Sequence, residues 1–149
     1  MAGIYIHIPF CRKKCHYCNF HFTTSLYYKD DLVKALIQEI TLQKEVIETI
    51  YVGGGTPSLL EIEELLLIIG QIRQIFSIAA GAEITLEANP DDITEEKLIG
   101  WKEAGINRLS IGIQSFFEED LQWMNRAHNA QQAKESLSQA KMHFDNITI

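Results

Sequence analysis

Short runs of β-branched and aromatic residues alternate with helical apolar spacings along the whole chain. The strand-like runs are residues 4–8, 49–52, 83–88, 108–113 and 146–149. Strands that alternate with helices are typical of βαβ units, which place the strands in one parallel sheet. The alternation therefore predicts an α/β fold with a parallel sheet. The sequence ends within the fifth predicted strand.

Local signals predict where two of the helices begin and where one of them ends. A capping box formed by Ser58 and Glu61 is expected to open the second helix. Asp91 or Asp92 is expected to cap the third helix, which should stop near Gly105. These positions place the helices between the predicted strands.

Length and composition restrict the class of protein. The chain of 149 residues has 46% hydrophobic and 22% charged residues, which is typical of a globular domain. No stretch approaches the roughly 20 apolar residues of a membrane-spanning helix, and residues 1–10 lack the features of a signal peptide. We therefore expect a cytoplasmic protein without stable membrane insertion. The net charge of −7 argues against nucleic acid as a partner.

The chain shows no internal repeat, linker or compositional break, so residues 1–149 are expected to form one unit. A parallel sheet that ended in its fifth strand would expose an unpaired edge and uncovered helix faces. We therefore expect this unit to be the N-terminal part of a longer protein.

All three cysteines of the chain, Cys11, Cys15 and Cys18, lie within one short loop after the first strand. An odd, clustered set in a chain without a secretion signal favours metal ligation over disulfides. The spacing is consistent with an iron–sulfur cluster that has one open iron. It is equally consistent with a structural zinc site completed by His21. Buried free thiols are a third interpretation, but the charged residues between the cysteines predict a solvated loop.

Three glycines, Gly53–Gly55, follow the second strand and precede Thr56 and Pro57. Consecutive glycines let a backbone approach a ligand closely, and their N–H groups can meet a carboxylate or a phosphate. The segment is not a Walker loop, and it fails the dinucleotide fingerprint because Ser58 replaces the third glycine of that motif. A tight turn needs fewer glycines, so the run predicts a ligand-binding role.

Three further polar residues are candidates for the same kind of role. Glu87 lies near the end of the third strand, where burial would require a partner such as a hydroxyl or an amine. A solvated strand end is an equal alternative for this carboxylate. Gln114 ends the fourth strand, and Arg126 fits either a ligand contact or a solvated helix charge.

The histidines are weaker signals than the cysteines. His7 lies on the first strand, where a histidine packs in the core more often than it binds a ligand. His128 and His143 fit a solvated helix face. For all three, a structural role fits the sequence at least as well as a ligand-binding role.

The stronger candidates follow successive strands of the predicted sheet. The cysteine loop, the glycine run, Glu87 and Gln114 come after strands one to four in turn. In parallel α/β barrels the active site lies at the carboxyl ends of the strands. We therefore predict that these residues share a single site.

Together these motifs resemble the radical S-adenosylmethionine (SAM) superfamily. The signature is the three-cysteine loop, with Tyr17 before its last cysteine, followed by the Gly-Gly-Gly-Thr-Pro segment. Residues 5–11, 87–90 and 107–115 further resemble the branch that contains the oxygen-independent coproporphyrinogen III oxidases and the heme chaperone HemW. This resemblance implies a partial (β/α)6 TIM-like barrel, of which the chain would supply the N-terminal units.

The resemblance also implies cofactors, partners and site residues. Cys11, Cys15 and Cys18 would bind a [4Fe-4S] cluster, and the amino and carboxylate groups of SAM would take its open iron. In such proteins one electron from the cluster cleaves SAM to a 5′-deoxyadenosyl radical. The implied partners are heme or a porphyrin, an electron donor for the cluster and a heme acceptor protein. The positions that match SAM-binding residues are Tyr5, Tyr17, Gly54, Gly55, Thr56, Glu87, Gln114 and Arg126.

One position departs from the oxidase pattern. The motif of the oxidases is Cys-x3-Cys-x2-Cys-x-Cys. In this chain Phe20 occupies the position of the last cysteine, which resembles the HemW-like pattern. This favours a HemW-like heme chaperone, with the oxidase as the alternative and a non-catalytic zinc module as a second alternative. The groups that bind heme are expected largely beyond Ile149, in the full-length protein.

Overall fold

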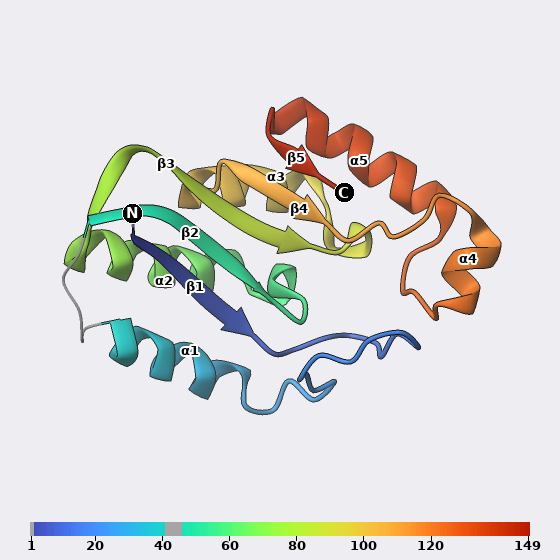
Figure 1. Cartoon of the computed structure of the whole chain (residues 1–149), viewed down its shortest axis with the longest axis horizontal. Helices are drawn as coiled ribbons and strands as arrows, with labels where there is room; N and C mark the ends of the chain where they lie inside the picture. Colours follow the sequence, from blue (N-terminus) through green and yellow to red (C-terminus); the bar gives the residue numbers. More distant parts are fainter. Residues whose placement is uncertain (1, 41–45) are drawn as a thin grey trace.

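The structure is a computed structural model of the chain, and it describes residues 2–40 and 46–149. Five strands form one sheet in which every neighbouring pair is parallel, in the same order as along the chain (Figure 1). This confirms the predicted α/β class. The strands are β1 (Ala2–Ile8), β2 (Val46–Gly54), β3 (Ser77–Ala88), β4 (Arg108–Ile111) and β5 (Ile147–Thr148).

Helical segments connect each strand to the next, as parallel neighbours require. No helix in the described ranges is long and apolar enough to cross a bilayer. The strand arrows end at a common edge, where the loop after β1 and the segment after β4 also lie (Figure 1). The helices are α1 (Lys29–Glu39), α2 (Ile62–Ile75), α3 (Glu95–Ala104), α4 (Glu118–Trp123) and α5 (Ala130–His143), with the short 3₁₀ turns η2 (Pro57–Leu59) and η3 (Pro90–Asp92).

The two sides of the sheet differ in chemistry because side chains alternate along each strand. Ile8, Ile50 and Leu86 are fully buried and belong to the core that the strands share with the helices. The intervening positions carry polar or aromatic side chains such as Tyr51 and Glu87, which are only partly buried. One side of the sheet is therefore closed by packing, and the other is polar and open to a ligand.

The predicted capping box of Ser58 and Glu61 is wrong. Glu61 is the N-cap of α2, and its box partner is Glu64, whose side chain accepts a hydrogen bond from the Glu61 N–H. Ser58 lies in η2, which Pro57 begins, and its hydroxyl donates to Asp92. The residue three positions before Glu61 therefore belongs to a separate turn and not to the helix.

The predicted cap of α3 is also wrong, although its end is confirmed. Asp91 and Asp92 lie in η3, and Thr94 caps the helix by accepting a hydrogen bond from the Lys97 N–H. Gly105 ends the helix with a φ of 93°, a left-handed conformation that glycine adopts without a Cβ clash.

Candidate functional site

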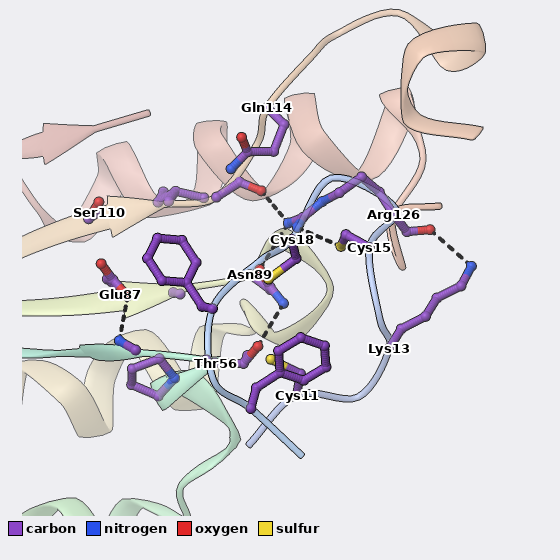
Figure 2. A pocket seen from close by; sticks show the side chains of 18 of the residues that line it. Cys11, Lys13, Cys15, Cys18, Thr56, Glu87, Asn89, Ser110, Gln114 and Arg126 are labelled. Carbon is purple, nitrogen blue, oxygen red and sulfur yellow. Dashed lines mark hydrogen bonds between the residues drawn. The ribbon is translucent and has the colours of Figure 1, made fainter. Parts of the chain in front are cut away.

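A cavity of about 500 Å³ lies at the carboxyl edge of the sheet. This volume is within the range of small-molecule sites. The cavity brings together side chains from the loop after β1, the ends of β2 and β3, and the segments after β4 and α4 (Figure 2). Gly53, the first residue of the glycine run, does not line the cavity. The lining includes every cluster and SAM residue that the family resemblance implied: Tyr5, Cys11, Cys15, Tyr17, Cys18, Gly54, Gly55, Thr56, Glu87, Gln114 and Arg126.

The cysteine loop is held mainly by polar contacts. The Cys11 N–H donates to the carbonyl of Thr23 at 3.0 Å, and the Cys18 N–H donates to the carbonyl of Cys15 at 3.2 Å. Cys15 is buried, whereas Cys11 and Cys18 are partly exposed. Burial raises the pKa of the Cys11 thiol, and the neighbouring Cys18 and Cys15 raise it further. The Cys11 thiol therefore favours its protonated form until a positive group joins it.

The cysteines do not form a preassembled site for one metal ion. Among the described residues, no group of three or more His, Cys, Asp or Glu side chains could hold such an ion. A zinc ion gathers four ligands around one centre, whereas a four-iron cluster takes each cysteine at a different iron and spreads them apart. His21, the predicted fourth zinc ligand, is exposed and does not line the cavity.

The glycine run packs directly against the cysteine loop. Gly54 has a φ of 117°, and its N–H donates to Glu87 Oε2 at 3.0 Å. A Cβ atom at Gly55 would lie 2.7 Å from the carbonyl oxygen of Phe10 and 3.0 Å from Sγ of Cys11. Glycine at these two positions is therefore required for the close approach of the two loops.

Both carboxylate oxygens of Glu87 have hydrogen-bond partners. Oε1 accepts from the Tyr51 hydroxyl at 2.7 Å, and Oε2 accepts from the Gly54 N–H. The Tyr51 ring stacks on Tyr5, with ring centroids 6.0 Å apart. The alternative of a freely solvated carboxylate is therefore wrong, since the carboxylate is fixed at the cavity wall (Figure 2).

The guanidinium of Arg126 contacts the loops that surround the cavity. Nη1 donates to Sγ of Cys15 at 3.3 Å and to the hydroxyl of Tyr17 at 3.1 Å. Nη2 donates to Oδ1 of Asn89 at 3.0 Å and to the carbonyl of Gly112 at 2.6 Å (Figure 2). Nε is buried without a partner. The alternative of a solvated helix charge is therefore wrong.

Gln114 lines the cavity from a strained backbone position. Its φ of 69° lies in the left-handed region, which residues other than glycine rarely adopt. Such strain is typical of functional sites, where the surrounding structure holds it in place. Thr56 is buried, and its hydroxyl accepts a hydrogen bond from the Asn89 amide at 3.2 Å.

Asn89 is a functional candidate that the sequence motifs did not predict. Its side chain bridges Thr56 and Arg126, which come from segments far apart in the sequence (Figure 2). It lies directly after β3, two positions beyond Glu87. Glu87 was predicted because it is a polar residue at the end of a strand. The same criterion would have identified Asn89.

The histidine predictions were wrong for two residues. His7 lies outside the core, lines the cavity, and has Nδ1 3.1 Å from the Tyr5 hydroxyl. His128 is only 3% exposed, and its Nε2 bonds to the carbonyl of Ile113. Burial lowers the pKa of His128, and the nearby charge of Arg126 lowers it further. His143 lies at the end of α5, as predicted, but it is partly buried.

A model of the radical SAM superfamily matches residues 5–149. The chain belongs to this superfamily. Among curated radical SAM relatives, the heme chaperone HemW of Escherichia coli strain K12 is 40% identical over 139 residues, covering 89% of this chain and 37% of that protein. The heme chaperone HemW of Bacillus subtilis strain 168 is 38% identical and covers 100% of this chain and 41% of that protein.

A solved radical SAM structure supports the same assignment. Coproporphyrinogen III oxidase (HemN) from Escherichia coli matches with a TM-score of 0.86 at 30% identity, covering 97% of this chain and 35% of that chain. This similarity confirms the predicted radical SAM fold. The chain spans about two fifths of the length of the curated HemW relatives described above.

Proposed function

We propose that the cavity binds a [4Fe-4S] cluster and SAM, and that the protein acts as a heme chaperone of the HemW kind. The observation that carries this proposal is that one cavity unites the three cysteines with Arg126, Glu87 and the glycine run. HemW relatives match the chain at up to 40% identity. An electron donor for the cluster and a heme acceptor protein are the partners that this function requires.

The residues of the cavity fit these cofactors. Three thiols from one loop leave one iron of a four-iron cluster without a protein ligand, which is the position that SAM needs. The buried Nε of Arg126 has no partner and can donate to a carboxylate. Gly55 leaves room at the point where a side chain would meet the cysteine loop.

Each group of the chain has a separate task in this arrangement. Cys11, Cys15 and Cys18 hold the cluster, Arg126 pairs with the SAM carboxylate, and Glu87 accepts hydrogen bonds from an ammonium or hydroxyl group. A bound cluster and SAM together supply one-electron chemistry. The chain itself contributes fixed donors and acceptors, and the close packing of the glycine run against the cysteine loop helps to exclude water.

The cluster is tested against the zinc alternative by anaerobic reconstitution of the chain with iron and sulfide. We expect a brown protein that gives an EPR signal after reduction. His21→Ala should leave the metal content unchanged, because His21 does not line the cavity. Stoichiometric zinc without cluster uptake, or loss of metal in His21→Ala, would overturn the proposal in favour of a zinc module.

Coproporphyrinogen oxidation is the second candidate function, and the structural match to HemN favours it. Phe20 argues against it, because a phenyl side chain cannot replace a cysteine as a ligand or proton donor. Phe20 lines the cavity and is 76% exposed. Heme titration and coproporphyrinogen turnover of the full-length protein, under anaerobic reducing conditions, separate the two functions. We expect heme binding without turnover, and turnover would establish the oxidase.

A further inference from the structure

A buried carboxylate outside the cavity wall pairs with the cysteine loop. The side chain of Asp92, in η3, has 0% exposure. Arg12, which stands between Cys11 and Cys15, donates from Nε to Oδ1 of this carboxylate at 3.0 Å and places Nη2 2.8 Å from the same oxygen. Ser58 donates its hydroxyl to Oδ2 at 2.8 Å. Asp92 thus joins the loop after β1 to the turn after β2.

The contacts of Asp92 continue into the wall of the cavity. The hydroxyl of Ser58 also accepts a hydrogen bond from the Asn89 N–H at 3.1 Å. The Asn89 side chain in turn contacts Thr56 and Arg126. One network therefore links the loop after β1, the turns after β2 and β3, and the segment after α4.

The cysteine loop depends on polar contacts of this kind because it buries little apolar surface. Of residues 11–18, only Cys15 is buried. Backbone contacts such as that from the His16 N–H to the carbonyl of Met124 also hold the loop. Within the described residues, Arg12–Asp92 is the one ion pair that residues 11–18 form. A carboxylate with no exposure is costly to leave unpaired, so the pair opposes movement of Arg12 away from η3.

We propose that Arg12 and Asp92 are positioning residues that hold the cysteine loop in the shape that the cluster requires. Ordering the three thiols before binding removes an entropic cost from cluster uptake, and it slows loss of iron afterwards. The function given to this fixed loop conformation rests on the proposed cluster. The fixed conformation itself exists in the cofactor-free chain, and the first test measures it in that chain.

The first test is the rate at which iodoacetamide alkylates Cys15 in the cofactor-free chain, followed by mass spectrometry. Cys15 is 9% exposed, so the folded loop protects it. We expect Arg12→Gln and Asp92→Asn to accelerate its alkylation by about tenfold or more, the factor that corresponds to losing one charge-assisted hydrogen bond. Lys14→Gln is the matched control, because it removes the same charge from an exposed position of the same loop.

A general loss of stability is distinguished by circular dichroism. Alkylation is measured well below the unfolding midpoint of each variant, and Arg12→Lys is included because it restores the charge but not the guanidinium geometry. We expect Arg12→Lys to give an intermediate rate. Rates for Arg12→Gln and Asp92→Asn that equal those of Lys14→Gln, or that follow the unfolded fraction alone, would overturn the proposal.

The second test uses the chain after anaerobic reconstitution and follows the loss of iron to a chelator by visible absorbance. We expect Arg12→Gln and Asp92→Asn to release iron about tenfold faster, and Lys14→Gln to match the unmodified chain within about twofold. Failure of every variant and of the unmodified chain to take up a cluster would count against the proposed function. Accelerated alkylation would still establish the positioning role in that case, whereas unaltered alkylation would refute it.

Discussion

Replacement of Arg126 by alanine should weaken SAM binding while the cluster is retained. In this structure Nε of Arg126 is buried without a partner, and the other two nitrogens already have acceptors on Cys15, Tyr17, Asn89 and Gly112. Nε is therefore the donor left for the SAM carboxylate. Loss of a charge-assisted hydrogen bond costs about 1.5–3 kcal/mol, which corresponds to about tenfold to more than a hundredfold in affinity.

A second variant separates the charge of Arg126 from its geometry. Arg126→Lys keeps the positive charge but cannot donate from several fixed nitrogens at once. We expect its SAM affinity to lie between those of the unmodified chain and Arg126→Ala. Arg73→Ala is the matched control, because Arg73 is exposed in the last turn of α2 and does not line the cavity.

The assay is calorimetric titration of SAM into the anaerobically reconstituted chain, with iron and sulfide quantified in each variant. SAM affinities are compared only between variants whose iron content is close to that of the unmodified chain, so that cluster occupancy is the same. The role assigned to Arg126 is wrong if Arg126→Ala binds SAM as tightly as the unmodified chain, or if Arg73→Ala loses as much affinity.

Three further changes have expected outcomes. Gly55→Ala should prevent normal cluster uptake, because the new Cβ would lie 3.0 Å from Sγ of Cys11. Gly70→Ala is the control and should leave uptake unchanged, because a Cβ there would meet no atom within 4 Å apart from its chain neighbours and the backbone of its own helix. Iron analysis checks both variants. Trp101→Ala should reduce the free energy of unfolding by about 3–5 kcal/mol in urea titrations, because the side chain is almost fully buried. The depressed pKa of His128 means that the unfolded chain binds a proton more readily than the folded one. The free energy of unfolding should therefore decrease as the pH falls below about 6.5, the ordinary value for histidine. His128→Gln should remove this part of the pH dependence in chemical denaturation.

The sequence predicted the presence and order of the strands better than their ends. β2 and β3 begin at Val46 and Ser77, earlier than expected, and these early residues pair with each other. Their segments carry charged and small residues, so apolar alternation does not mark them. β4 stops at Ile111, two residues early, because the Ile113 N–H bonds to the carbonyl of Ile111 and turns the chain away from the ladder.

The sequence predicted those site residues that lie at the ends of predicted strands. Cysteines, glycines and Glu87 have distinctive chemistry at positions that a parallel sheet brings together. Asp92 was instead interpreted as a helix cap. An aspartate shortly before a helix has the same local sequence pattern whether it caps the helix or pairs with a distant arginine. Its partner, Arg12, lies 80 residues away, and no local pattern records that contact. His128 was misplaced for the same reason, since its burial depends on packing between distant segments.

The sequence separation of these contacts has a consequence for biosynthesis. A ribosome makes the cysteine loop first, but Asp92 follows Arg12 by 80 residues and Arg126 follows Cys15 by 111. Contacts between such distant segments form only after the later segment has left the ribosome. A nascent chain that ends before η3 therefore carries the three thiols on a loop that lacks its contacts with Asp92 and Arg126. Iron and sulfide for the proposed cluster would therefore meet the fully supported loop only after the segment that carries Arg126 has left the ribosome, and cysteine oxidation is a hazard of the interval before.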